Sequence, residues 1–254
     1  GILIIPADNP TGYQMSQDII IEIAKMCVEK NIWLISDEAY RNIYYTDNGP
    51  TSIWNISNDI VPGIKGRRIS IESVSKVWNA CGLRIGALVT DNEVMFDKVR
   101  SEYTANLCAN VIGQYIFGAI GHLSSQEILE WYKIQREYYS EIITDLVNGL
   151  EEELPGLIIS KPKASIYIIL DFSGITPDDF NITNFIEYSA KYGICDYDNK
   201  KYTLLLSSMN GFFTTKISDN KLARIALVEP KDKMKVVPSL LSSLLSDYLI
   251  KFEV

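Results

Sequence analysis

Three short motifs place polar and charged side chains directly behind predicted strands. They are DNPTG at residues 8–12, DEAY at 37–40 and SVSKVWNACGLRIG at 73–86. The third motif carries two cations, Lys76 and Arg84, in a segment too apolar and too rich in glycine to be an ordinary charged helix face. Ligands of open α/β sheets bind outside the carboxyl ends of the strands. The motifs therefore predict one ligand site that combines an amine, a carboxylate and a guanidinium.

Each motif by itself also has an ordinary structural explanation. Asn-Pro-Thr-Gly is a common turn sequence. Asp-Glu follows strands in many folds, and a lysine that leaves a strand end is often a solvated surface residue. The prediction of a site therefore depends on the three motifs occurring together.

The elements that must position these motifs alternate between strand and helix. Strands are predicted at ILII, NIWLIS, RRISIES and GALVTD, and a helix is predicted from Ser16, its N-cap, to Lys30. A short, continuously apolar run such as NIWLIS is typical of a buried parallel strand. Strands separated by helices or long crossings predict an α/β fold with a parallel-type sheet.

The rest of the chain predicts a helical stretch and then a smaller mixed part. Helical periodicity dominates from Asn92 to Leu154. Beyond it, strands are predicted at LIIS, ASIYIILDFS, TLLLSS and ARIALV, and helices at DDFNITNFIEYSAKYG and KVVPSLLSSLLSDYLIKF. We therefore divide the chain into an α/β part at 1–108, a helical connection at 109–154 and a small α+β domain at 155–254.

The composition excludes several classes of function. A hydrophobic fraction of 47% is typical of a folded protein, and a net charge of −8 without a basic patch argues against nucleic-acid partners. No run of eighteen apolar residues predicts a membrane span. The single His122 leaves almost no material for a His-based zinc site or a Ser-His-Asp triad. The four cysteines lack metal-site spacing, and their apolar surroundings predict buried free thiols in a reducing, cytoplasmic compartment.

In this order, the motifs resemble those of the fold-type I, class I/II aminotransferases, which use pyridoxal 5′-phosphate (PLP). NPTG, DEAY, SxSK and an arginine eight residues after the lysine carry the resemblance. KPKASIYIILDF is similar to a strand of the family's small domain, and MNGFF followed by LARIAL resembles its carboxylate-binding loop and strand. The resemblance spans essentially the whole chain and looks closest to aspartate-aminotransferase-like enzymes. It implies the PLP-dependent transferase fold, with residues 1–108 as the C-terminal portion of the large PLP-binding domain.

The resemblance implies catalytic roles for three residues. Lys76 would form the Schiff base with the cofactor aldehyde and move a proton between the substrate Cα and the cofactor, work that needs the free amine. Asp37 would lie against the pyridinium nitrogen and keep it protonated. Tyr40 would reach the phenolic oxygen of the cofactor, as would Asn9 from the NPTG turn.

The resemblance also implies the residues that hold the cofactor phosphate and the substrate. Ser73 and Arg84 would bind the phosphate, one as a hydroxyl donor and the other as a permanently charged fork. Arg224 would take the substrate α-carboxylate, with Asn9 beside it. No metal is expected.

These roles imply transamination between an L-amino acid, with aspartate among the candidates, and a 2-oxo acid. The enzyme would belong to amino-acid metabolism and act as a homodimer with active sites at the subunit interface. Two other functions remain open: a C–S lyase of the same fold with the same cofactor residues, and an aminotransferase-like sensor domain of a transcription regulator. Screening substrates with and without a 2-oxo acid acceptor would identify the lyase, and an upstream DNA-binding region would identify the regulator.

Family members carry a segment before NPTG that has no counterpart in this sequence. It holds a phosphate-binding loop at a helix N-terminus, an aromatic residue that stacks on the cofactor and a tyrosine lent to the neighbouring subunit. We therefore expect a fragment of a longer aminotransferase that binds cofactor poorly and turns over little by itself. Its exposed strand edges and apolar faces would need a partner surface.

Overall fold

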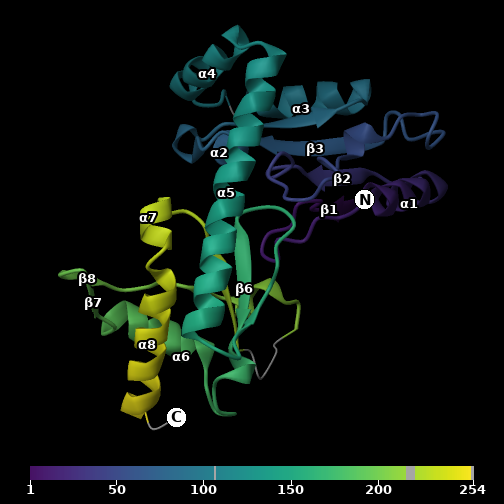
Figure 1. Cartoon of the computed structure of the whole chain (residues 1–254). Helices are drawn as coiled ribbons and strands as arrows, with labels where there is room; N and C mark the ends of the chain where they lie inside the picture. The colour runs from purple at the N-terminus through teal and green to yellow at the C-terminus, as the bar shows by residue number, and fades with distance from the viewer. Residues whose placement is uncertain (106, 216–220, 253–254) are drawn as a thin grey trace. The chain divides into compact units, whose positions relative to one another are not determined.

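The computed structural model describes residues 1–105, 107–215 and 221–252 and separates into two compact units (Figure 1). Unit 1 consists of Gly1–Asn9, Tyr13–Arg136 and Lys163–Ser165. Unit 2 consists of Pro10–Gly12, Glu137–Pro162 and Ile166–Val254. The three-part division at residues 108 and 154 stays a prediction. Each helix within the described residues is too short or too polar to cross a bilayer.

Unit 1 is an α/β unit built on a four-stranded sheet in the order β1-β2-β3-β4 (Figure 1). Strands β1, β2 and β3 run parallel, as the sequence predicts. The elements of this unit are β1 Ile2–Ile4, α1 Gln17–Glu29, β2 Leu34–Asp37, η1 Ile53–Asn55, β3 Arg68–Ser73, α2 Val74–Val77, η2 Cys81–Leu83, β4 Gly86–Thr90, α3 Glu93–Ala105, α4 Val111–Gly118, η3 Ala119–His122 and the first part of α5 Ser125–Glu153.

Strand β4 departs from the predicted parallel-type sheet because it runs antiparallel to β3, from the pair Ser73↔Gly86 to Ile69↔Thr90. A parallel return needs a crossover, usually a full helix packed on one face of the sheet. Here the connecting residues form only the one-turn helix α2 and the short turn η2. The chain therefore reverses direction beside β3, and the sheet is mixed.

Helix α1 begins as its sequence predicts. The Ser16 hydroxyl accepts a hydrogen bond from the Ile19 N–H at 3.3 Å, which satisfies one of the amides that a helix start leaves open. Ile20, Ala24 and Cys27 recur at helical spacing and are fully buried. They pack with residues of β1, β2 and the following loop in the core of unit 1.

Unit 2 has an antiparallel sheet in the order β5-β6-β10-β9 and a separate hairpin, β7-β8. Its elements are the rest of α5, β5 Ile158–Ile159, β6 Tyr167–Asp171, η4 Phe172–Gly174, α6 Ile182–Lys191, β7 Cys195–Tyr197, β8 Lys200–Tyr202, β9 Ser207–Ser208, η5 Met209–Phe212, β10 Leu222–Ala226, α7 Lys231–Met234 and α8 Val237–Phe252. In its core the rings of Phe172, Phe180 and Phe185 contact one another, and the Tyr248 ring contacts those of Phe180 and Phe185. The hairpin was not predicted, and only the last two residues of the predicted TLLLSS strand pair in the sheet.

The predicted burial of the four cysteines is wrong for two of them. Cys27 and Cys195 are buried free thiols as predicted, but Cys81 and Cys108 are exposed, because they lie in the η2 turn and in the connection between α3 and α4.

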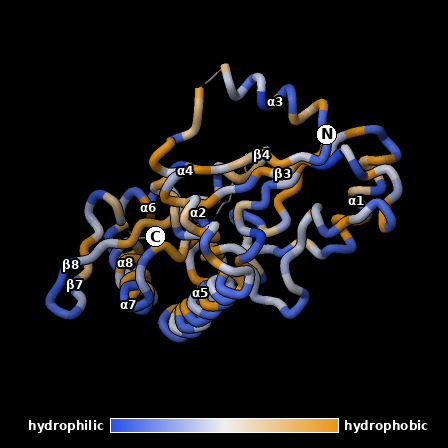
Figure 2. Tube along the Cα trace, turned by 90° about the horizontal axis from the view of Figure 1, so that it is seen from above, coloured by the Kyte–Doolittle hydropathy of each residue, from blue (hydrophilic) through white to orange (hydrophobic). Residues whose placement is uncertain are grey.

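Within unit 1, apolar side chains of β4 and α4 are exposed, and these segments carry hydrophobic colours in Figure 2. Ile112 is 72% exposed and Tyr115 87% exposed, so α4 presents apolar side chains outside the core of its unit.

Candidate active site

The parts of the three sequence motifs that belong to unit 1 follow its strands at one edge of the sheet. Because β1, β2 and β3 are parallel, the loops that follow them lie at the same edge. Asp37 is the last residue of β2, and Ser73 is the last residue of β3. Asn9 follows β1 in a turn that the Asp8 N–H closes with a 2.9 Å hydrogen bond to the Tyr13 carbonyl.

Lys76 and Tyr40 are brought together at this edge from two different motifs. The Lys76 Nζ lies 5.9 Å from the centroid of the Tyr40 ring, within the range of a cation–π contact. Tyr40 is buried, at 6% exposure. Asp37 Oδ1 accepts a 3.1 Å hydrogen bond from the Ala39 N–H, which fixes the turn between the carboxylate and the phenol. An amine, a phenol and a carboxylate therefore lie on adjacent strand ends.

The two predicted phosphate ligands differ in their surroundings. The Ser73 Oγ caps α2 by accepting a 3.1 Å hydrogen bond from the Ser75 N–H, and its own proton remains able to donate. Arg84 is exposed and lies in the left-handed region at φ 56°. Its Nη1 donates to the Cys81 carbonyl at 2.9 Å. Ser73 therefore caps the helix that carries Lys76, whereas Arg84 lies on an exposed loop and donates to the η2 turn.

Arg224 belongs to unit 2, where it lies on β10 close to two aromatic rings. Its guanidinium carbon is 4.4 Å from the centroid of the Tyr167 ring and 5.1 Å from that of Phe212. Its Nη2 is 3.4 Å from the Ser207 Oγ. Tyr167 and Phe212 come from the KPKASIYIILDF and MNGFF motifs, so the two motifs meet at the predicted arginine. Aromatic faces hold a planar guanidinium in a defined orientation.

Helix α5 binds the short helix that carries Lys76, a contact that the sequence did not reveal. A helix leaves its last carbonyl groups without partners inside the helix. The Trp131 indole N–H donates to the Val77 carbonyl at 2.9 Å, and the buried Gln135 Nε2 donates to the Lys76 carbonyl at 3.2 Å. The Trp131 ring also stacks on that of Trp78, with centroids 6.1 Å apart. These contacts fix α2 from its C-terminal end.

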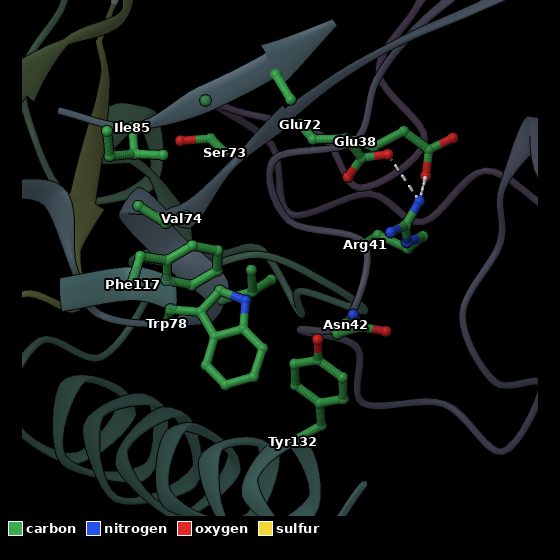
Figure 3. A pocket seen from close by; sticks show the side chains of 13 residues that line it. Glu38, Arg41, Asn42, Glu72, Ser73, Val74, Trp78, Ile85, Phe117 and Tyr132 are labelled. Carbon is green, nitrogen blue, oxygen red and sulfur yellow. Dashed lines mark hydrogen bonds and ion pairs between the residues drawn. The ribbon is translucent and has the colours of Figure 1, made fainter. Parts of the chain in front are cut away.

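A buried acidic network beside this site was also missed. Glu38 is 3% exposed, and its Oε1 accepts hydrogen bonds from the hydroxyls of Ser36 and Ser52 at 3.0 and 2.9 Å. Burial raises the pKa of the Glu38 carboxyl, against the opposing effects of Arg41 and these hydrogen bonds. The Arg41 Nη1 lies 3.3 Å from Glu38 Oε2 and 2.9 Å from Glu72 Oε1 (Figure 3).

A cavity of about 160 Å³ lies beside this network (Figure 3). Glu38, Arg41 and Glu72 line one part of it, and aromatic side chains including Trp78 line another. Of the seven predicted site residues, only Ser73 lines this cavity. Ser73, which caps the helix that carries Lys76, therefore connects the cavity with the site around Lys76, Tyr40 and Asp37.

Comparison with known proteins identifies the family. The sequence pattern of the family described as "Aminotransferase class I and II" matches residues 1–190. The chain belongs to this family. Its curated relatives include a probable aspartate/prephenate aminotransferase of Aquifex aeolicus, 26% identical over 196 residues, and the glutamate-pyruvate aminotransferase AlaA of Escherichia coli, 29% identical over 190 residues. The aligned regions cover 76% and 72% of this chain, and 48% and 43% of those aminotransferases.

Solved aminotransferase structures share the fold of this chain. A PLP-bound putative aminotransferase from Clostridium difficile 630 superposes with a TM-score of 0.78 at 18% identity, over 96% of this chain and 57% of that one. The α-aminoadipate aminotransferase LysN from Thermus thermophilus superposes with a TM-score of 0.77 at 19% identity, over 98% and 59%. The chain therefore has the fold of these aminotransferases and spans about half the length of the curated relatives it matches.

Proposed function

We propose that this chain is part of a PLP-dependent aminotransferase that transfers an amino group from an L-amino acid to a 2-oxo acid. The observation that carries the proposal is the position of the Lys76 Nζ over the buried Tyr40 ring, at the sheet edge where Asp37 ends β2. Membership of the class I and II family supports the same activity. Both observations therefore support the proposal.

The side chains at this edge fit PLP by their chemistry. When bound, the cofactor supplies an aldehyde carbon and a ring that draws electrons from the substrate. We assign Lys76 to hold the aldehyde carbon and move the substrate proton, and Asp37 to keep the ring nitrogen protonated. Tyr40 and Asn9 would hydrogen-bond the phenolic oxygen.

We assign the cofactor phosphate to the hydroxyl of Ser73 and the guanidinium of Arg84. A guanidinium has five N–H donors, so the Arg84 bond to the Cys81 carbonyl leaves donors for an anion. Arg224 would take the substrate carboxylate, supported by the two aromatic rings that orient its guanidinium. The predicted homodimer and cytoplasmic location belong to the same proposal, the second supported by four free cysteines.

The names of the relatives give candidate substrates. Their names include aspartate/prephenate, LL-diaminopimelate and glutamate-pyruvate aminotransferases. The amino donors in these names share an α-amino acid head group, whose carboxylate Arg224 would bind in our proposal. We therefore propose an L-amino acid as donor, with aspartate as the first one to test.

An amino-transfer assay tests this function. The purified chain is incubated with PLP, one of a panel of L-amino acids and one of several 2-oxo acids, beside a Lys76→Ala control. Formation of a new amino acid that depends on the acceptor, and is absent in the control, would support the proposal. Product formed without any acceptor would favour the lyase, and equal transfer by the control would overturn the role of Lys76.

A further inference from the structure

We propose that Arg41 is a positioning residue of this site, because its guanidinium joins the ends of the two strands that carry Asp37 and Ser73. The inference rests on the proposed function, which gives those two residues and Lys76 their roles. It concerns only unit 1, in which all the residues involved lie.

The sequence repeats a Ser-x-Glu pattern on neighbouring strands. Ser36 precedes Glu38 by two residues, and Ser70 precedes Glu72 by two. The parallel register of β2 and β3 pairs Ser36 with Ser70, so the two patterns are aligned across the sheet. Side chains two residues apart on a strand point to the same face. The alignment therefore brings two carboxylates to neighbouring positions at the ends of β2 and β3.

Each glutamate accepts a hydrogen bond from the serine two residues before it. The Ser36 hydroxyl donates to Glu38 at 3.0 Å, and the Ser70 hydroxyl donates to Glu72 at 2.9 Å. The Trp54 indole N–H in turn donates to the Ser70 hydroxyl at 2.9 Å. These bonds leave each carboxylate with little freedom to move away from the other.

Arg41 supplies the cation that two neighbouring carboxylates require. One nitrogen, Nη1, contacts Glu38 at 3.3 Å and Glu72 at 2.9 Å (Figure 3). The Glu38 side chain is fully buried, and those of Arg41 and Glu72 are 29% and 24% exposed. Like charges at this proximity repel strongly where water is limited, and a shared cation offsets the repulsion. Without it, the strand ends carrying the two glutamates would be pushed apart.

The glutamates are direct chain neighbours of the predicted site residues. Asp37 precedes Glu38, and Ser73 follows Glu72. The Glu38 N–H also donates to the Ile71 carbonyl at 2.9 Å, the last bond of the ladder between the two strands. A separation of the glutamates would therefore strain this bond first, and then the Ser73 cap of the helix that carries Lys76.

Arg68, the first residue of β3, provides a matched control for Arg41. It pairs with Asp91 at 2.6 Å, with side chains 12% and 17% exposed, and its guanidinium lies 4.9 Å from the Trp54 ring centroid. It is thus a paired, partly buried arginine at the opposite end of β3 from the proposed site. If Arg41 only stabilises the fold, Arg41→Met and Arg68→Met should have similar effects on exchange and PLP binding for the same loss of stability.

The experiment compares Arg41→Met, Arg41→Lys and Arg68→Met in the full chain by two measurements. The first is amide hydrogen exchange, without cofactor, in peptides that cover residues 36–41 and 70–76. The second is the dissociation constant for PLP, from the absorbance change on titration. We expect Arg41→Met to raise exchange in both peptides and to raise the dissociation constant, each by about 10-fold for a lost charged hydrogen bond. Arg41→Lys should recover part of both, and Arg68→Met should change neither measurement at the site by more than about 2-fold.

The outcomes separate this inference from the proposed function. Wild-type exchange in both peptides for Arg41→Met, or equal effects of Arg41→Met and Arg68→Met at the site, would overturn the positioning role. If Arg41→Met does not fold, Arg41→Gln, which also removes the cation, decides the same question: raised exchange in both peptides supports the role and wild-type exchange contradicts it. A wild-type chain that shows no PLP absorbance change would count against cofactor binding by this chain alone, while the exchange results would still test the link between the strands.

Discussion

The contact between α5 and α2 predicts a specific local effect of Trp131→Phe. The substitution keeps an aromatic ring beside Trp78 but removes the indole N–H that donates to the Val77 carbonyl at 2.9 Å. Val77 is 8% exposed, so water reaches this carbonyl poorly. The last turn of α2 should therefore lose a bond that little else replaces.

The size of the effect follows from the cost of an unsatisfied buried acceptor. A buried group that loses its partner costs about 1–3 kcal/mol. The Gln135 bond to the neighbouring Lys76 carbonyl remains and limits the loss, so we expect the lower part of that range, about 1–2 kcal/mol. That corresponds to an increase of about 5- to 30-fold in the opening of α2.

Hydrogen exchange of two amides measures this opening directly. The Asn79 N–H donates to the Lys76 carbonyl and the Ala80 N–H to the Val74 carbonyl, so both amides exchange when α2 opens. Trp33→Phe, the same chemical change outside α2 and α5, is the control. Exchange that is unchanged in Trp131→Phe, or raised equally in the control, would refute the conclusion that α5 fixes the Lys76 helix.

Three further predictions concern stability. Burial raises the pKa of Glu38 above its ordinary 4.5, so ionisation of this residue lowers the free energy of unfolding as the pH rises from 4.5. In urea unfolding, the stability of Glu38→Gln relative to the wild type should therefore increase toward neutral pH. A relative stability that falls as the pH rises would contradict the reasoning. Gly86→Ala would place a Cβ 2.8 Å from the Glu72 carbonyl oxygen, so we expect a loss of about 1–3 kcal/mol by the same method; an unchanged unfolding midpoint would show that β3 and β4 are less closely packed than the structure indicates. Phe172 is fully buried against Phe180 and Phe185, so Phe172→Ala should cost about 3–5 kcal/mol, seen as an earlier thermal transition; a transition at the wild-type temperature would be inconsistent with that core.

Local sequence signals predicted much of the fold. The Ser16 cap, the spacing of Ile20, Ala24 and Cys27 and the apolar run of β2 each depend on residues close together in the chain, and the structure confirms them. The antiparallel direction of β4 was missed because it depends on how the chain returns to the sheet. The predicted TLLLSS strand pairs only at Ser207 and Ser208, since a strand needs a partner as well as propensity.

In the candidate site, too, local motifs were predictive and long-range contacts were not. Short motifs predicted that Asp37, Tyr40 and Lys76 come from adjacent strand ends, and the structure places them there. The link through Arg41 depends on the register of β2 and β3, which no single motif encodes. The repeated Ser-x-Glu pattern was the available signal, but its meaning appears only when the two strands are aligned.

The most direct test of the proposed function is to locate where PLP attaches to this chain. The chain is mixed with PLP, reduced with borohydride and digested, and the peptides are examined by mass spectrometry for a pyridoxyl group. We predict that the pyridoxyl group is found mainly on Lys76. In Lys76→Ala, we predict that no lysine is labelled above the background level of the surface lysines. Labelling spread evenly over the lysines, with no preference for Lys76, would contradict the proposed active site.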